Sequence, residues 1–287
     1  MFNYTDHVRR LMEDIVSRVP ALSAIDVADV LVFARQGRTS THGAYATCHS
    51  LMLPDSEPAY YFWRDRRTGR LTRRSEWFVT RSPQVRMGGR RVRHLISISL
   101  PRFCDQKLKG SAKEDAYPEQ SDALAKLDTI VHELYHIDPH GGGIRTSARA
   151  DGRPSAQTHT PQFFRDVRAL VHQYLATSPD PAVIAFLALT FDELVARHGG
   201  VVATAFRTFP SFPQRYRERL AEQPPLPRAM HLVPLAVHHG QQYFTEADIE
   251  VRQFLPHTSR RLIARTHSIK GVHPRPQTHV AAAASRR

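Results

Sequence analysis

The chain has 287 residues and a net charge of +13, and its hydrophobic fraction of 41% supplies enough apolar material for a sizeable core. Its longest apolar run, residues 182–191, falls well short of the ~20 residues that cross a bilayer, and acidic residues near the N-terminus argue against a signal peptide. The chain has only two cysteines, Cys48 and Cys104, which excludes a disulfide framework and predicts a cytoplasmic protein.

The first third of the chain predicts one helix followed by a mainly antiparallel sheet. An apolar stripe at helical spacing covers residues 4–19, and Pro20 ends it. Extended runs rich in β-branched and aromatic residues follow at 29–35, 45–53, 60–64, 70–80 and 91–100. The last of these runs alternates Ile and Leu with Ser97 and Ser99, which predicts a strand with one polar face.

Helical patterns dominate the middle of the chain. Ser121 is a typical N-cap for a helix over residues 121–137, and Thr160 with Pro161 begins a second helix. A glycine-rich loop, residues 140–159, joins these two helices. A third helix is expected at 181–198, and a short basic helix at 211–220.

These patterns predict an α+β fold with a boundary near residue 224. In the expected main domain, residues 1–223, an antiparallel sheet (27–104) packs on a set of helices (121–198). A Pro/His/Arg-rich, basic C-terminal extension, partly disordered, is expected over 224–287.

One motif predicts a metal site. The sequence HELYH at residues 132–136 has the form HExxH. His132 and His136 are four residues apart on a predicted helix, so both imidazoles lie on one face, about 5–6 Å apart, and can reach one ion. Glu133 is rotated by about 100° from His132 and can act on a water without being a ligand. Neutral imidazoles suit Zn²⁺, and three protein ligands with one open position form the catalytic arrangement.

The third metal ligand must come from beyond this helix. His159 is favoured, because it stands directly before a capped helix that Phe163 anchors. His140 is an alternative, although Pro139 displaces it from the helical face. Glu193 on a later helix and Asp138 remain further alternatives.

The order of these residues resembles a known family. HExxH followed by His159-x-x-x-Phe163 is similar to the minimal zincin core of SprT-like and WLM-type metallopeptidases, and residues 127–145 resemble phage-type metallopeptidases. The resemblance covers about residues 96–175. It implies a zincin-like core for the main domain, in which the sheet packs on the HExxH helix and the catalytic helices that follow it. The chain departs from SprT-like proteins at Thr160, where they commonly have glycine, and it has no paired-cysteine zinc ribbon; both departures argue against a DNA-repair role.

A zinc metallopeptidase is the function that the motif and the resemblance predict. Zn²⁺ on His132, His136 and His159 would activate a water, with Glu133 as the general base in peptide-bond hydrolysis. Arg145, Tyr117 and His140 are candidates for a second electrophile, and Arg145 is favoured. Asp128, one turn before the motif, is a candidate for orienting an imidazole or is a solvated helix residue. By analogy with zincins, residues 93–100 are expected to line the cleft and pair with substrate.

Two rival functions remain open. A catalytically idle, zinc-stabilised module would keep the histidines without needing Glu133 as a base. A nucleic-acid-binding protein would explain the basic segment 64–109, in which 14 basic residues accompany 3 acidic ones. An arginine-rich, solvated sheet face has the same composition. A protein or peptide substrate is thus the expected partner, nucleic acid a second possibility, and no membrane partner is expected.

Overall fold

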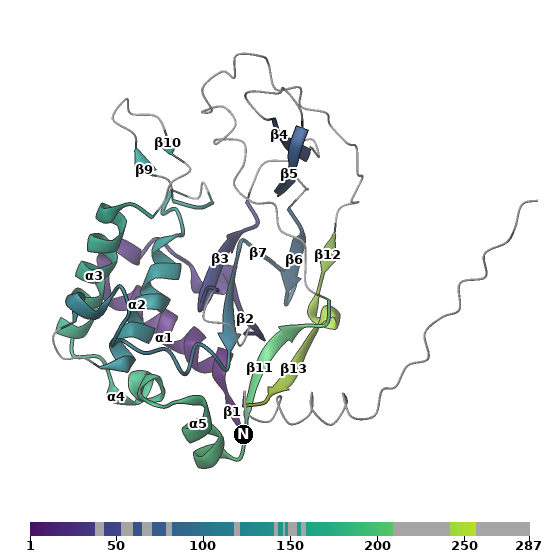
Figure 1. Ribbon diagram of the computed structural model, residues 1–287. Helices are drawn as coiled ribbons and strands as arrows, with labels where there is room; N and C mark the ends of the chain where they lie inside the picture. Colours follow the sequence, from purple (N-terminus) through teal and green to yellow (C-terminus); the bar gives the residue numbers. More distant parts are fainter. Residues whose placement is uncertain are drawn as a thin grey trace, which may run out of the picture.

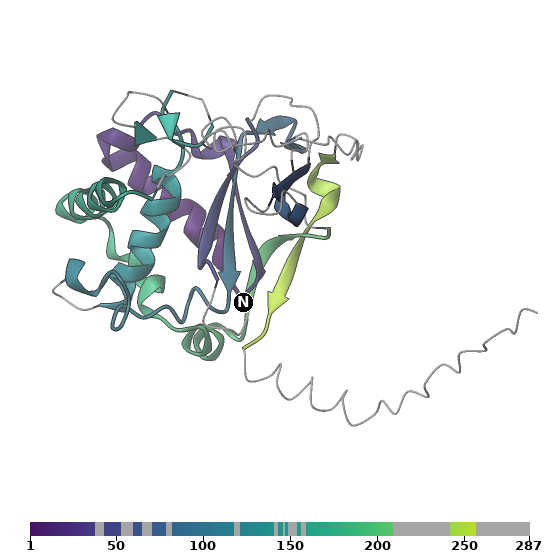
Figure 2. The same cartoon turned by 45° about the horizontal axis from the view of Figure 1, so that its top comes forward.

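The computed structural model describes residues 1–37, 43–52, 60–64, 71–78, 82–117, 121–140, 143–145, 147–148, 154–155, 159–208 and 242–256. Within them, helices gather on one side of a set of small sheets, as both views show (Figure 1, Figure 2). The fold is α+β, as predicted. The expected helix at 211–220 and the chain beyond residue 256 lie outside the described residues.

Helix α1 (Tyr4–Arg18) confirms the first predicted helix. The Asn3 side chain caps it by accepting from the Asp6 N–H. The predicted apolar stripe is buried except for the half-buried Val16, and the helix contacts strands β2 and β11. Burial of this face is what fixes the helix on the sheet, because a short isolated helix is marginal in water.

The sheet nearest the helices has the order β2-β8-β3, formed by Val30–Gln36, His94–Leu100 and Ala46–Ser50. Strands β2 and β8 are parallel over their whole length, so the expectation of an antiparallel sheet is wrong for this pair. Strand β3 is antiparallel to β8, with Cys48 opposite Ile96. A parallel pair needs a long crossover, and the chain between β2 and β8 supplies it.

Strand β8 is central rather than at an edge. All its residues are buried, so the predicted polar face is wrong: Ser97 and Ser99 are 0% and 3% exposed. The Ser99 hydroxyl donates to the Ala44 carbonyl at 3.0 Å, which removes the cost of burying it. Residues 93–100 therefore do not form the open edge predicted for substrate; among the described strands of this sheet, β3 and β2 are the outer ones.

The remaining strands form small sheets. Strand β11 (Val201–Phe206), absent from the sequence-based prediction, lies between β1 (Phe2–Asn3) and β13 (Ile249–Phe254). Strands β4 (Tyr60–Arg64) and β5 (Leu71–Phe78) form an antiparallel pair, which confirms the extended runs expected at 60–64 and 70–80. The other described strands are β6 (Gln84–Met87) with β7 (Arg90–Val92) and β12 (Tyr243–Phe244), and β9 (Ser147–Ala148) with β10 (Pro154–Ser155). Strands β12 and β13 come from residues assigned above to the C-terminal extension, and both pair with strands of the main domain.

Helices α2 (Asp122–Tyr135) and α3 (Pro161–Ala176) confirm their predictions, including the caps Ser121 and Thr160. The third predicted helix is not continuous. It divides into α4 (Pro181–Ile184), a 3₁₀ turn and α5 (Phe191–His198). The break occurs because Thr190 acts as the N-cap of a new helix. Its side chain forms a capping box with Glu193. No described helix is long and apolar enough to span a bilayer.

Candidate metal centre

The last turn of α2 presents two histidines to one side. The middle of the helix is anchored by Leu127, Ile130, Val131 and Leu134, which are all buried in the main core. This apolar stripe fixes the rotation of the helix about its axis. His132 and His136, four residues apart, therefore point to the same place, with His136 forming the C-cap of the helix.

The start of α3 brings in a third histidine. The Thr160 hydroxyl accepts from the Phe163 N–H at 3.2 Å, and Pro161 occupies the first helical position. His159 therefore has a fixed backbone position directly before the helix. Phe163 is 5% exposed, and its ring centroid lies 4.8–5.4 Å from those of all three imidazoles. This buried ring therefore packs against all three imidazoles.

The three Nε2 atoms converge on one point. They lie 3.1 Å apart between His132 and His136, and 3.0 Å from each of these to His159. A neutral imidazole carries only one N–H, so three mutually close nitrogens make a poor hydrogen-bond network and a good ligand set. Three nitrogens at this spacing fit a single Zn²⁺, which takes Zn–N distances of about 2.0–2.1 Å.

The protonation state of the cluster also fits a metal. Burial, followed by the neighbouring His159 and Lys113, lowers the pKa of His132 to about 3, so this imidazole is neutral at pH 7. His136 is buried, His132 is half-buried and His159 is exposed, so the cluster is open to solvent on one side. Such an arrangement leaves room for a further ligand, as a catalytic site requires.

Glu133 lies next to the cluster without joining it. Its side chain is buried at 5% exposure, and its Oε2 accepts from the backbone N–H of Cys48 at 2.7 Å. This bond anchors the carboxylate to strand β3. No local pattern predicts this contact, because Cys48 and Glu133 come from segments far apart in the chain.

The rival third ligands lie elsewhere. After His136 the chain folds back on itself: the Asp138 N–H donates to Gly143 O, and Arg145 N–H to His136 O. Gly143, at a φ of +100°, permits this turn, and a Cβ there would stand 2.8 Å from the Ser50 hydroxyl. His140 and Asp138 are therefore outside the cluster, with His140 exposed. Glu193 is likewise outside it, engaged in the α5 capping box.

The predicted auxiliary residues have different roles from those expected. Tyr117 is buried and donates to Asp128 Oδ2 at 2.6 Å, while Lys113 binds Asp128 Oδ1 at 2.6 Å. Asp128 thus holds these two side chains rather than an imidazole. Desolvation, and then the charge of Asp128, raises the pKa of Tyr117, which keeps the phenol protonated. The Tyr117 hydroxyl, a candidate for the second electrophile, is thus engaged by Asp128.

Arg145 stays close to the cluster. Its guanidinium lies 4.1 Å from the centroid of the Tyr135 ring, and its Nε donates to the Tyr135 carbonyl at 2.8 Å. It therefore satisfies a carbonyl at the C-terminal end of α2 and carries a positive charge one turn from His132.

Comparison with protein-family models, with curated proteins and with solved structures gives no match.

Proposed function

We propose that the chain is a zinc-dependent metallopeptidase of the zincin type, with His132, His136 and His159 as metal ligands and Glu133 as general base. The observation that carries this proposal is the convergence of three imidazole Nε2 atoms, 3.0–3.1 Å apart, two of which come from the last turn of the helix that also carries Glu133. Bound Zn²⁺ would supply a Lewis acid that acidifies water and polarises a peptide carbonyl.

Glu133 provides the proton transfers. Its carboxylate accepts a proton from the attacking water as the new carbon–oxygen bond forms, and it donates that proton to the amine nitrogen as the carbon–nitrogen bond breaks. The Cys48 N–H holds one carboxylate oxygen at 2.7 Å, which restricts the rotation of the group. A base fixed in this way loses little entropy when the reaction begins.

Strand β3 gives the substrate a place to bind. Ser99 N–H donates to Tyr45 O and Leu51 N–H to Arg93 O, so Tyr45 and Leu51 direct these groups towards β8. By the alternation of an antiparallel ladder, Cys48 directs its backbone groups to the opposite edge. That is the edge at which Cys48 contacts Glu133. An extended peptide added at this edge would pass the general base.

The basic segment 64–109 does not enter this proposal. Among its described residues, Arg90 binds Asp26 and Asp29, and Lys107 binds Asp122. These pairs are exposed and offset part of the positive charge. Nucleic-acid binding stays a prediction from composition.

The proposal is tested by hydrolysis of a fluorogenic peptide library. Glu133→Gln should lower kcat by about 10²–10⁴-fold while zinc content and folding stay unchanged, since only the proton acceptor is lost. Glu13→Gln, on the exposed face of α1, is the matched control and should behave as the unmodified protein. Hydrolysis retained in Glu133→Gln would refute the mechanism, and a zinc-loaded protein that cleaves no peptide in the library would favour the idle module.

A further inference from the structure

The first turn of α3 exposes an aromatic ring beside the histidine cluster. Phe163 and Phe164 are neighbours on this turn, and helical geometry directs their side chains about 100° apart. Phe163 is buried, whereas Phe164 is 45% exposed. The other exposed large apolar residues of the described chain lie at its start and around β12 and β13: Met1, Tyr243, Val251 and Leu255. A single exposed apolar residue is ordinary on a protein surface, so the importance of Phe164 depends on what its ring contacts.

Phe164 contacts two of the three candidate ligands. Its ring centroid lies 5.8 Å from that of His159, with the two planes 16° apart, and 5.9 Å from that of His132, with the planes 37° apart. Nearly parallel rings at this separation are offset, so the imidazole of His159 covers only part of the Phe164 face. An open apolar surface therefore adjoins the point at which the three Nε2 atoms meet.

The polar side chains around Phe164 bind one another. Gln162 Nε2 donates to Asp166 Oδ1 at 2.5 Å, and the Arg165 guanidinium donates to Gln162 Oε1 at 2.7 Å. The Tyr135 hydroxyl donates to Asp166 Oδ2 at 3.0 Å. Because these groups are already engaged, the contact that this turn offers to a ligand is the apolar ring of Phe164.

The path of the proposed substrate passes between β3 and α3. Helix α2 contacts both elements (Figure 1). Its last turn holds Glu133 against Cys48 at the outer edge of β3, and the same turn holds His132 against the ring of Phe164. A bond attacked at this site must lie within reach of the Glu133 carboxylate and of the three Nε2 atoms. A peptide added to the outer edge of β3 therefore has α3 on its other side.

The distance from Phe164 to the cluster is short on the scale of a peptide. An extended chain advances about 3.2–3.4 Å per residue. The Phe164 centroid lies 5.8–5.9 Å from the centroids of two imidazoles whose Nε2 atoms converge on the reacting position. The ring is thus within about two residues of the scissile bond.

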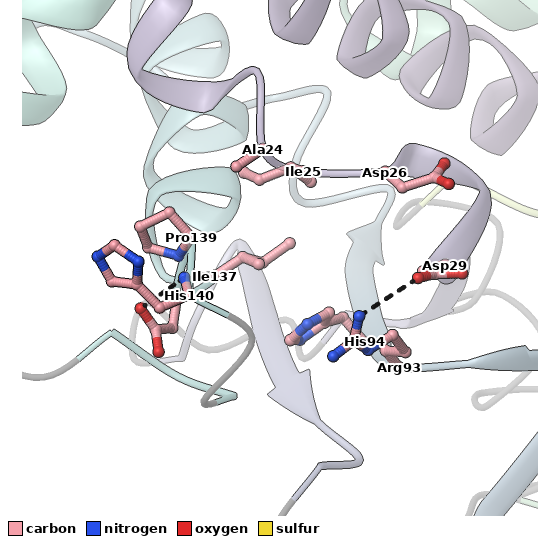
Figure 3. Close-up of a pocket in the computed structure, with 10 residues that line it drawn as sticks. Ala24, Ile25, Asp26, Asp29, Arg93, His94, Ile137, Pro139 and His140 are labelled. Carbon is pink, nitrogen blue, oxygen red and sulfur yellow. Dashed lines mark hydrogen bonds and ion pairs between the residues drawn. The ribbon is translucent and has the colours of Figure 1, made fainter.

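A pocket of about 270 Å³ near the end of α2 is a poorer place for a substrate side chain. It is lined by residues 24–29, by the start of β8 and by the chain directly after α2 (Figure 3). None of these segments belongs to α3 or to β3. Two of its aspartates are also engaged, because Arg90 binds Asp26 and Asp29, and Arg93 lies 3.8 Å from Asp29.

We propose that Phe164 is a specificity-determining residue, which binds an apolar side chain of the substrate, such as leucine, next to the scissile bond. The side chain packs on the open face of the ring, and both surfaces are removed from water. An acidic side chain in the same place would lose hydration without gaining a partner from the ring. The inference rests on the proposed peptidase function, because it names the side chain that the same site prefers.

The first test uses a peptide of alanine and serine that carries one leucine. Cleavage, located by mass spectrometry, should fall beside the leucine and should move with it when the leucine is placed elsewhere in the peptide. The value of kcat/KM should be about tenfold higher than for the same peptide with alanine in place of leucine, as partial burial of a leucine side chain allows. Cleavage at positions independent of the leucine would overturn the proposal.

Variants of Phe164 assign this preference to the ring. Phe164→Ala should reduce the ratio of kcat/KM between the leucine and alanine peptides to near one. Phe164→Arg should favour a peptide with glutamate in place of leucine, a reversal that misfolding cannot produce. Val251→Ala removes another exposed apolar side chain and is the matched control, which should keep the tenfold ratio.

A purely structural role for Phe164 predicts a different result. If the ring only held His159 in place, Phe164→Ala would lower zinc content and would slow the cleavage of both peptides equally. That outcome would overturn the proposal, and so would a preference for lysine over leucine in the unmodified protein.

The second test needs no catalysis. Calorimetry should show that Glu133→Gln binds the leucine peptide about tenfold more tightly than the alanine peptide, and that Phe164→Ala in the same background abolishes the difference. Hydrolysis by the unmodified protein without a leucine preference would overturn the role of Phe164 and leave the peptidase intact. Preferential binding of the leucine peptide without any hydrolysis would overturn the peptidase and leave Phe164 in a peptide-binding site.

Discussion

Polar side chains in the middle of α2 and in its last turn differ in the partners that they meet. In the middle, the Lys126 ammonium is 1% exposed and donates to the Leu187 and Leu189 carbonyls at 2.8 and 2.9 Å. Asp128 accepts from Tyr117 and binds Lys113. In the last turn, His132 and His136 instead face another imidazole, that of His159.

The difference distinguishes polar side chains that stabilise the fold from polar side chains that can bind a ligand. Groups that meet complementary partners, as Lys126 and Asp128 do, stabilise the fold and leave little capacity for a ligand. Three like nitrogens at 3.0–3.1 Å are complementary to a cation rather than to one another. Substitutions in the two parts of α2 should therefore affect different properties: stability for the middle, metal binding for the last turn.

The largest expected change in stability comes from the middle of the helix. Asp128→Ala should lower the free energy of unfolding by about 3 kcal/mol, because it leaves Lys113 and Tyr117 without their shared partner. Zinc content should not change. Lys107→Ala, which removes a pair with 61% side-chain exposure for Lys107, should cost about 0–1 kcal/mol. Urea unfolding measures both variants, and loss of zinc from Asp128→Ala would contradict the separation.

Acid should expose a second effect, which comes from buried imidazoles. Burial lowers the pKa values of His49 and His94 to about 4, from 6.5 in the unfolded chain. Between these values the unfolded state binds more protons, so the stability contribution is complete above pH 6.5 and falls as the pH drops towards 4, by about 1.4 kcal/mol per pH unit for each group.

The measurement is unfolding free energy at pH 7, 6 and 5. His94→Gln should reduce the slope of stability against pH, since one of the buried imidazoles with a lowered pKa is removed. A slope identical to that of the unmodified protein would show that His94 is not neutral by burial. His172→Gln, an exposed position on α3, serves as the control.

The smallest expected effect concerns Arg145, at the boundary between the two parts. Arg145→Lys keeps the charge but loses the planar group over Tyr135 and the Nε bond to its carbonyl. We expect about 1 kcal/mol of destabilisation and unchanged zinc content. A strong fall in kcat with unchanged stability would instead assign Arg145 to the reaction, as the second electrophile that the sequence favoured.

Local patterns in the sequence predicted much of the helical part. Caps at Ser121 and Thr160 and the apolar stripe of α2 are read from neighbouring residues, so the helices and the three histidines follow from short-range rules. The choice of His159 over His140 also had a local cause, since Pro139 prevents the α2 face from continuing.

The pairing of strands that are distant in the chain could not be predicted from the sequence. Nothing local distinguishes a parallel from an antiparallel partner for β8, and its serines looked solvent-facing because their carbonyl partners are distant in the chain. The contact of Glu133 with Cys48 depends on that same register. The break between α4 and α5 was hidden because the 181–198 stretch keeps an apolar character through the 3₁₀ turn.

The most direct test of the metal centre is zinc content per chain after purification, measured by elemental analysis. The unmodified protein and His140→Ala should each retain one zinc ion per chain, whereas His159→Ala should retain clearly less than one, although its folding is unchanged. Because each ligand contributes about a quarter of a binding energy near 10–16 kcal/mol, loss of one lowers affinity by about 10²–10³-fold. Full zinc content in His159→Ala, with loss in His140→Ala, would contradict the account.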